Sequence, residues 1–367
     1  MFKRKPAIDQ TLEAAVADFQ DPYLEQDLGA SGAIREATLK GERARLVVEL
    51  GYPARGYADD LCRELEQRLT ALEQVAAAEV EVSWRIESHA VQSNLKPLEG
   101  VRNVIAVASG KGGVGKSTTA VNLALALAAE GANVGVLDAD IYGPSQPRML
   151  GLPGEKPESP DGKTMYPLRA HGLQCMSAGF LVDEEQPMVW RGPMATSALN
   201  QLVTETRWDD LDYLVVDMPP GTGDIQLTLS QRVPVSGAVI VTTPQDIALL
   251  DARKGLRMFE KVGVNILGII ENMSTHICSN CGHEEHIFGS GGGERIAEQY
   301  DVPLLGSLPL DLSIREQADG GQPSVVAEPE GAIALAYREI ARRTAAKLAS
   351  AGRDYSHAFP KITIENG

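Results

Sequence analysis

Residues 110–117 read GKGGVGKS, and this stretch decides the fold. It follows an apolar run, Val104 to Ala108, and precedes a helical segment from Thr118 to about Glu130. The pattern G-x-x-x-x-G-K-S between a strand and a helix predicts a phosphate-binding loop, because its glycines let backbone N–H groups turn toward a phosphate. We expect Lys116 to reach the β- and γ-phosphates of ATP and the Ser117 hydroxyl to bind Mg²⁺. The expected nucleotide-binding loop comprises Gly110, Lys111, Gly112, Gly113, Val114, Gly115, Lys116, Ser117 and Thr118.

Short continuous apolar runs recur on both sides of this loop and alternate with helical segments. They lie at residues 104–108, 134–137, 213–216, 238–242 and 267–270. Apolar strands without alternation, separated by helices, indicate a mostly parallel sheet that is covered on both faces. We therefore expect a doubly wound α/β domain over residues 101–351, closed by a helix at about 332–350. A tail follows over residues 352–367, with a further expected strand at 361–364.

The first hundred residues have a different pattern. A helical segment at 12–19 precedes two alternating segments, 33–39 and 44–50, that are typical of a hairpin. A second helix at about 57–72 and a strand at about 79–86 complete a small α/β unit. We expect this domain to span residues 1–86, and the polar stretch with Pro and Gly at 87–100 to be a linker.

Composition excludes several classes of protein. The chain has 367 residues and a net charge of −16, which disfavours binding to nucleic acids and to anionic membranes. No apolar run approaches the roughly 18 to 20 residues of a membrane span, and MFKRK at the start is followed by polar residues, unlike a signal peptide. We expect a cytoplasmic protein. Four cysteines in so long a chain do not make a disulfide framework, so the expected roles of reactive cysteines are metal or redox chemistry.

Polar residues end three of the expected strands. Asp138 and Asp140 follow the run at 134–137, and Asp217 and Gly221 follow the run at 213–216. Ligands of open α/β sheets bind at the carboxyl ends of strands, so these residues should face the phosphate loop. Asp217 suits the binding of Mg²⁺ through water, and the Gly221 N–H suits the γ-phosphate. Asn272 follows the run at 267–270 and has the donor and acceptor that an adenine edge requires.

Cys278 and Cys281 form a C-x-x-C pair just after that last strand. Two thiolates are too few for an iron–sulfur cluster or a structural zinc ion, which take four ligands. The missing ligands can come from a second copy of the chain, or from His283 and His286 in a Cys₂His₂ zinc site. A redox disulfide and a pair without a role remain open as well. Cys62, in an expected helix, and Cys175 are interpreted as packing residues.

The second lysine of the loop, Lys111, makes it resemble the MinD/ParA/nitrogenase iron protein class of P-loop ATPases. In that class the extra lysine crosses a homodimer interface to the partner's nucleotide, which the resemblance implies for Lys111. The resemblance further implies that Asp140 positions the attacking water, that Asp138 supports the Mg²⁺ shell and that Asn272 contacts adenine. Lys111, Lys116 and Asp140 are thus the expected catalytic residues.

Five motifs sharpen this resemblance: KGGVGKST, DADIYGPSQPRMLG, DMPPGTGD, ENMS with CSNCGH and IFGSGGGE, and LPLDLSIREQADGGQP. Together they resemble the Mrp/ApbC family of iron–sulfur cluster carrier ATPases over residues 101 to about 345. The resemblance implies a homodimer that hydrolyses ATP slowly, holds a labile [4Fe–4S] cluster between Cys278 and Cys281 of two subunits, and delivers it to apoproteins.

The N-terminal unit resembles the small PaaD-like iron–sulfur assembly domain. That domain commonly has a cysteine after its second strand, whereas residues 51–56 here read GYPARG. Direct handling of metal by this unit is therefore not expected. Two alternatives to the carrier are a MinD/ParA-like spatial regulator and a zinc-stabilised nucleotide switch. The C-terminal HAFPKITIENG lacks the basic amphipathic helix of MinD-type proteins, which disfavours the spatial regulator.

Overall fold

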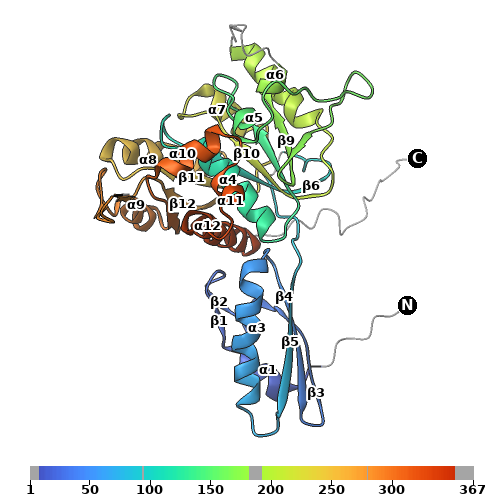
Figure 1. Ribbon diagram of the computed structural model, residues 1–367. Coiled ribbons are helices and arrows are strands. Elements are labelled where there is room, and N and C mark those ends of the chain that lie inside the picture. The colour runs from blue at the N-terminus through green and yellow to red at the C-terminus, as the bar shows by residue number, and fades with distance from the viewer. Residues whose placement is uncertain (1–7, 93–94, 182–191, 279, 352–367) are drawn as a thin grey trace, which may run out of the picture.

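The structure is a computed structural model, and it describes residues 8–92, 95–181, 192–278 and 280–351. The strand expected at 361–364 lies outside the described residues. Among the described helices, none has the length and apolar character needed to cross a membrane. The chain folds into a small unit and a larger one, which lie one below the other in Figure 1.

The small unit is a three-stranded sheet covered by helices. The strands β3 (Ile34–Lys40) and β4 (Arg43–Leu50) form the expected antiparallel hairpin, and β5 (Ala77–Trp84) pairs parallel to β4. The long helix α3 (Arg55–Thr70) connects β4 to β5 and runs along the sheet (Figure 1). Shorter elements complete the unit: α1 (Gln10–Ala17), β1 (Gln20–Asp21), β2 (Gln26–Asp27) and α2 (Leu28–Ser31).

Alternation along β4 explains the core of this unit. Every second residue, Ala44, Leu46, Val48 and Leu50, is buried. Helix α3 buries Leu61, Leu65 and Leu69, which recur every four residues and so lie on one face. The strand period of two and the helix period near four therefore direct both elements toward the same core.

The larger unit contains an eight-stranded sheet in the order β15-β12-β11-β6-β10-β7-β9-β8. All neighbouring strands are parallel except β8, which pairs antiparallel to β9 at one edge. The strands are β6 (Val101–Ala108), β7 (Val134–Asp138), β8 (Leu168–Ala170), β9 (Leu173–Ser177), β10 (Leu211–Asp217), β11 (Gly237–Thr242), β12 (Ile266–Glu271) and β15 (Leu304–Ser307). The predicted α/β class, with a mostly parallel sheet and a small N-terminal α/β unit, is confirmed.

Helices cover this sheet and connect its strands. Helix α4 packs on β7 and β10 and against α12, while α8 packs on β11. The helices are α4 (Lys116–Ala129), α5 (Gln146–Met149), α6 (Gly192–Thr204), α7 (Asp224–Ser230), α8 (Asp246–Lys261), α9 (Gly292–Tyr300), α10 (Leu312–Asp319), α11 (Ser324–Ala327) and α12 (Ala332–Ala349). A 3₁₀ turn spans Ala178–Phe180, and a small separate ribbon is formed by β13 (His276–Ile277) and β14 (Glu284–Glu285).

A buried carboxylate joins the two units. Glu130 caps the C-terminus of α4 and is completely buried. Its Oε1 accepts hydrogen bonds from Arg338 Nε and Arg342 Nη1 of α12, each at 2.7 Å. Its Oε2 accepts from the Gly56 N–H at the start of α3, at 2.8 Å. A negative charge is unfavourable at the C-terminus of α4, so the two arginines and the N-terminus of α3 are what stabilise it there.

We expect Glu130→Ala to lower the free energy of unfolding by about 3 kcal/mol, because the change leaves Arg338 and Arg342, whose side chains are only 15% and 13% exposed, without this acceptor. Urea unfolding followed by circular dichroism measures the loss. The matched control is Glu339→Ala, on the surface of α12, whose carboxylate pairs with Arg343 while both side chains are about half exposed. That control should change stability by less than about 0.5 kcal/mol. Equal midpoints for the two variants would contradict the role given to Glu130.

Candidate functional site

The loop after β6 lies at the carboxyl edge of the sheet and leads directly into α4. Gly113 and Gly115 have φ of 81° and 80°, a left-handed backbone that residues with a Cβ rarely adopt. A Cβ on Gly110 would stand 2.1 Å from the backbone carbon of Asp251 in α8. The glycines at these three positions are therefore required by the backbone, as a loop that wraps a phosphate requires.

Lys116 is the first residue of α4, and its side chain is buried. Its amine contacts Asp217 Oδ1 at the end of β10 and lies 3.2 Å from the Ser117 hydroxyl. It also lies 4.0 Å from Asp140 Oδ2, just after β7. The structure thus brings together the loop lysine, the loop serine and two of the acidic residues that the sequence places at strand ends.

Asp138, which is expected to support the Mg²⁺ shell, is engaged by hydrogen bonds within the chain. It is completely buried, and both of its oxygens already accept hydrogen bonds: Oδ1 from Asp140 N, and Oδ2 from Ser145 N, Gln146 N and Ser177 Oγ, all at 3.0 to 3.1 Å. Burial, together with the negative charge of Asp217, raises the pKa of Asp138 to about 7 despite these donors. Asp138 thus holds the segment from 140 to 146 in place through these hydrogen bonds.

Asp140 lies in the same site, close to Lys116. Burial raises its pKa above the ordinary value, although the positive charge of Lys116 opposes that shift. Its carboxylate faces the lysine that the phosphate loop provides. A carboxylate at this place can accept a hydrogen bond from a water molecule next to a bound phosphate.

Two of the expected nucleotide contacts are already engaged within the chain. The Gly221 N–H, expected on the γ-phosphate, donates to Ser109 O at 3.0 Å. Asn272, expected on adenine, is buried and donates from Nδ2 to Val114 O at 2.9 Å, beneath the phosphate loop. Gly221 must release Ser109 before its N–H can reach a phosphate, and the Asn272 amide nitrogen supports the loop in the arrangement seen here.

One residue of the site was not predicted from the sequence. Gln146, at the start of α5, is completely buried and donates from Nε2 to Asp217 Oδ2 at 2.9 Å and to Ser117 O at 3.1 Å. It stands between the acid of β10 and the serine of the loop. No pattern in the sequence distinguishes it, because its two partners are 29 and 71 residues away along the chain.

The residues at this edge fit a magnesium ion. Mg²⁺ binds hard oxygen ligands and keeps several waters, and a hydroxyl and carboxylates are the donors gathered around Ser117 and Asp217. Asp217 and Asp138 are both completely buried, and Lys116 is the cation in contact with Asp217 among the described residues. Buried acids in excess over cations favour a further positive charge, which Mg²⁺ would supply when it enters with a nucleotide.

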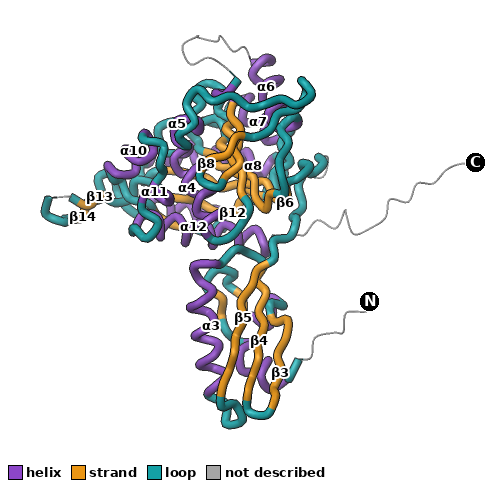
Figure 2. Tube along the Cα trace, turned by 45° about the vertical axis from the view of Figure 1, so that its right-hand side comes forward, coloured by secondary structure: helices purple, strands orange, loops and turns teal. Residues whose placement is uncertain are grey.

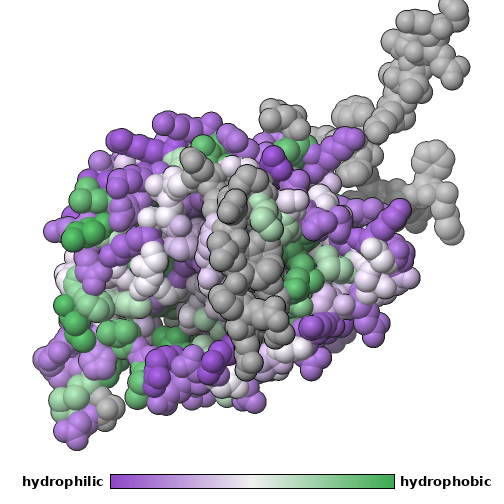
Figure 3. All heavy atoms as spheres, turned by 90° about the horizontal axis from the view of Figure 1, so that it is seen from above, coloured by the Kyte–Doolittle hydropathy of each residue, from purple (hydrophilic) through white to green (hydrophobic). Residues whose placement is uncertain are grey.

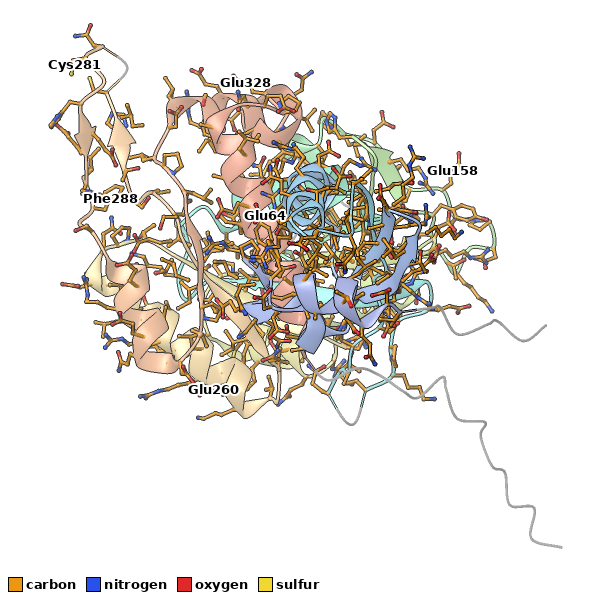
Figure 4. The ribbon with its side chains drawn as sticks, turned by 90° about the horizontal axis from the view of Figure 1, so that it is seen from below. Glu64, Glu158, Glu260, Cys281, Phe288 and Glu328 are labelled. Atoms are coloured by element: carbon orange, nitrogen blue, oxygen red, sulfur yellow. The ribbon has the colours of Figure 1, made fainter. Side chains whose placement is uncertain are left out.

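The C-x-x-C pair lies on a ribbon that projects from the body of the protein (Figure 2). Strands β13 and β14 pair antiparallel, and the turn between them is closed by hydrogen bonds from Cys278 N to His283 O at 2.9 Å and from Gly282 N to Cys278 O at 2.8 Å. Cys281 lies at the far end of the ribbon, whereas Phe288 lies at its base (Figure 4). Cys281 is therefore accessible from outside the protein, and Cys278 is partly accessible.

The local backbone favours the thiolate of Cys278. Cys278 is half-buried and Cys281 is exposed, and all four cysteines are free thiols. Hydrogen bonds from the backbone N–H groups of Asn280 and Cys281 lower the pKa of the Cys278 thiol. In contrast, burial raises the pKa of Cys62 in α3 and of Cys175 in β9. Of these three thiols, only that of Cys278 has a lowered pKa.

The two candidate histidine ligands do not converge on the cysteines. His286 Nδ1 donates to Ser274 O at 3.0 Å, and His283 Nε2 lies 3.8 Å from Glu285 Oε1. Over the ranges that the structure describes, no three His, Cys, Asp or Glu side chains are grouped as a metal site requires. The described part of the ribbon therefore offers two thiols per chain, and no preformed Cys₂His₂ set.

Lys111 differs from Lys116, because its amine has no partner among the residues that the structure describes. No described residue forms a hydrogen bond or an ion pair with its amine, although its carbonyl accepts a hydrogen bond from Ser109 Oγ at 2.9 Å. Nearby, Asp251 of α8 approaches Gly110, and the same helix exposes Ile247 and Leu250. Hydrophobic side chains reach the surface in several places where the larger unit is seen from above (Figure 3).

Two family models match the chain, one on each unit. Residues 100–345 match the model of the NUBPL iron-transfer P-loop NTPases, and residues 9–82 match that of iron-sulfur cluster assembly proteins. The resemblance to Mrp/ApbC ATPases with an N-terminal assembly domain is thereby confirmed.

Curated relatives cover most of the chain. An iron-sulfur cluster carrier protein of Pseudomonas fragi is 61% identical over 76% of this chain and 97% of its own length. That of Escherichia coli K12 is 51% identical over 94% of each chain. The mouse iron-sulfur cluster transfer protein NUBPL is 57% identical over 70% of this chain and 80% of its own.

Solved structures resemble the larger unit. A nucleotide-binding protein of Archaeoglobus fulgidus in complex with ADP has a TM-score of 0.55 and 35% identity, covering 64% of this chain and 90% of the other. The cell division ATPase MinD of Pyrococcus furiosus has a TM-score of 0.51 and 25% identity, covering 66% and 97%. With a family model over residues 100–345 and relatives at 51% identity along nearly the whole length, the chain belongs to the family of NUBPL iron-transfer P-loop NTPases.

Proposed function

We propose that this protein is an ATP-hydrolysing carrier that, as a homodimer, holds a [4Fe–4S] cluster between Cys278 and Cys281 of its two subunits and transfers it to apoproteins. The observation that carries the proposal is the exposed ribbon with two thiols and no further grouped ligand among the described residues, on a chain with a phosphate loop. The names of the curated relatives, cluster carrier and cluster transfer proteins, support it.

Counting ligands leads to the dimer. A cluster held by thiolates takes four cysteines, and each chain offers two at a suitable spacing. A two-fold axis supplies the other two from the same residues of a second chain. A cluster at the end of two ribbons has little protein around it, so it can be passed to another protein more readily than a buried electron-transfer centre can.

The surface beside the phosphate loop supports the same dimer. Ile247 and Leu250, at the start of α8, are 69% and 54% exposed. Apolar side chains of this size that face solvent side by side are typical of surfaces that another protein covers. A second subunit placed here would bring its own phosphate loop close to Lys111, whose amine has no partner among the described residues.

In the nucleotide site we assign one role to each side chain. Lys116 neutralises the β- and γ-phosphates, Asp140 positions the attacking water, and Lys111 acts on the nucleotide of the other subunit. Ser117 and Asp217 hold Mg²⁺, which supplies positive charge between the phosphates when it is bound. Asp138 supports this arrangement through the segment that it anchors, Asn272 supports the loop and the adenine, and Gly221 approaches the γ-phosphate once it has released Ser109.

Anaerobic purification and transfer test the proposed function. The protein is reconstituted with iron and sulfide, analysed for iron, sulfide and zinc, and mixed with the apo form of an enzyme whose activity needs a [4Fe–4S] cluster. We expect about four iron and four sulfide per two chains, and recovery of the acceptor's activity. One zinc ion per chain with no uptake of iron would replace the carrier by a zinc-stabilised nucleotide switch.

Lys111 is expected to act across the dimer, and complementation measures this. Lys111→Ala and Lys116→Ala should each reduce ATP hydrolysis. In a mixed dimer the Lys111→Ala subunit keeps its own Lys116 and receives Lys111 from its partner, so one of the two sites is complete. An equal mixture should therefore regain about a quarter of wild-type turnover, since half of the dimers are mixed.

The same mixture of variants would give a different result if Lys111 did not act across the dimer. If Lys111 serves its own subunit, both sites of a mixed dimer are defective, and mixing restores nothing. The control is a mixture of either variant with itself at the same total concentration. Nucleotide binding by Lys111→Ala should stay near that of the wild type, because the lysine completes only the site of the partner.

A further inference from the structure

Gln146 connects the two groups on which Mg²⁺ depends. Its backbone N–H donates to Asp138 Oδ2 at 3.1 Å, and this hydrogen bond anchors the residue. Its side-chain Nε2 then donates to Asp217 Oδ2 at 2.9 Å and to Ser117 O at 3.1 Å. Because both partners of Nε2 are acceptors, the orientation of the amide is determined by its hydrogen bonds.

The contact with Gln146 gives the two oxygens of the Asp217 carboxylate different partners. Oδ2 is taken by the Gln146 amide, and Oδ1 faces the amine of Lys116. Oδ1 is thus the oxygen that remains directed toward the phosphate loop. The second acceptor of the amide, Ser117 O, belongs to the residue whose hydroxyl is proposed to hold Mg²⁺. One amide therefore sets the position of the carboxylate relative to the serine.

The other end of the same amide has no partner. Gln146 Oε1 is fully buried and accepts no hydrogen bond among the described residues. A buried acceptor without a donor is unfavourable, and such atoms are rare in folded proteins. Mg²⁺ keeps several of its waters when it binds to a protein, and those waters are donors. The unpartnered oxygen lies on a side chain that touches both expected magnesium-binding residues.

We infer that Gln146 is a positioning residue for Mg²⁺: its amide nitrogen fixes Asp217 against Ser117, and its carbonyl oxygen accepts a hydrogen bond from metal-bound water. The inference rests on the proposed Mg-ATP site. It assigns to Gln146 a contribution to the metal and none to the nucleotide itself, because the residue touches the two metal-binding residues and not the N–H groups of the phosphate loop.

Two substitutions of Gln146 distinguish an effect on the binding of Mg²⁺ from an effect on the binding of the nucleotide. Gln146→Met keeps the length and the packing of the side chain and removes both hydrogen-bonding atoms. Gln146→Asn keeps the amide but shortens the chain by one methylene, so it cannot reach Asp217 and Ser117 together. The control is Arg148→Ala, at an exposed position of the same short helix. Melting curves show which variants fold, and either of the two Gln146 variants suffices.

The measurement is the affinity for a fluorescent ATP analogue, with saturating Mg²⁺ and in EDTA. In EDTA, the affinity of both Gln146 variants for the analogue should be within about twofold of that of the wild type. The factor by which Mg²⁺ raises this affinity should be about tenfold smaller in the variants, since hydrogen bonds to a charged group are lost. Arg148→Ala should keep the full enhancement. In a titration with Mg²⁺ at a fixed concentration of the analogue, the Gln146 variants should need about tenfold more Mg²⁺ than the wild type to reach half-saturation.

Three results would overturn the inference. Gln146 variants with the full Mg²⁺ enhancement would show that Asp217 needs no positioning. An equal loss with and without Mg²⁺ would show that Gln146 only supports the structure of the loop. A wild-type protein without any Mg²⁺ enhancement would overturn the proposed site itself, and the role of Gln146 with it, so this failure is distinguishable from the other two.

Discussion

Lys116→Ala is expected to reduce ATP hydrolysis at least ~100-fold. The lysine amine is buried at the carboxyl edge of the sheet, where it contacts Asp217 and lies 4.0 Å from Asp140. Charge that develops on the phosphates during the reaction has few other partners in such a site, and fixed positive groups are worth more there than in water. The variant also leaves two acids without their cation, so its binding of Mg-ATP should weaken as well.

Steady-state release of phosphate measures this prediction. Lys40→Ala is the control, because Lys40 ends β3 in the small unit, is exposed, and lies far from the phosphate loop. Melting temperatures of both variants show that the fold persists. Wild-type turnover in a folded Lys116→Ala protein would contradict the assignment of the loop as the hydrolytic site.

The centre of the fold could be predicted because its strands are buried on both faces. Strands β6, β7, β11 and β12 are almost entirely buried, so each contains a continuous apolar run in the sequence. Strand β15 was not predicted, since its four residues, LLGS, include only one buried side chain and lie at the edge of the sheet. Edge strands are determined by pairing with a neighbour, which no local pattern reveals.

The phosphate loop could be predicted for a similar reason. The backbone of the loop requires glycine at positions 113 and 115, so the loop can be identified from the types of its residues and their spacing. The second layer of the site could not be predicted. Gln146 and Glu130 depend on partners that only the folded chain brings near, 71 residues away for Asp217 and more than 200 for the arginines of α12. Glutamine and glutamate carry no local signal for such contacts.

The chemical type of a residue also did not determine what it binds. Asn272 and Asp138 have the donors and acceptors that adenine and magnesium require, but in the folded chain Asn272 supports Val114 and Asp138 anchors the segment before α5. Buried polar groups are satisfied by the partners that the fold brings near, and for these two residues those partners belong to the protein itself. Roles toward a nucleotide therefore need tests by substitution.

Removal of either cysteine of the ribbon should abolish cluster binding. In Cys278→Ala or Cys281→Ala, a dimer retains only two thiolates at the shared site, which is too few for a cluster that takes four. The broad absorbance of the reconstituted protein at roughly 400 nm should disappear, while binding of ATP stays near normal. The phosphate loop and the ribbon are separate, because the loop follows β6 and the ribbon follows β12.

Matched controls exist within the same chain. Cys62→Ala and Cys175→Ala remove thiols whose pKa burial raises, one in α3 and one in β9, and should leave the absorbance intact. The variants His283→Ala and His286→Ala distinguish a zinc site from an iron–sulfur cluster. A zinc site of two cysteines and two histidines would lose its metal in all four ribbon variants, whereas a cluster shared by two chains depends only on Cys278 and Cys281. Since the histidines engage Glu285 and Ser274 and do not converge on the thiols, we expect both histidine variants to keep the cluster.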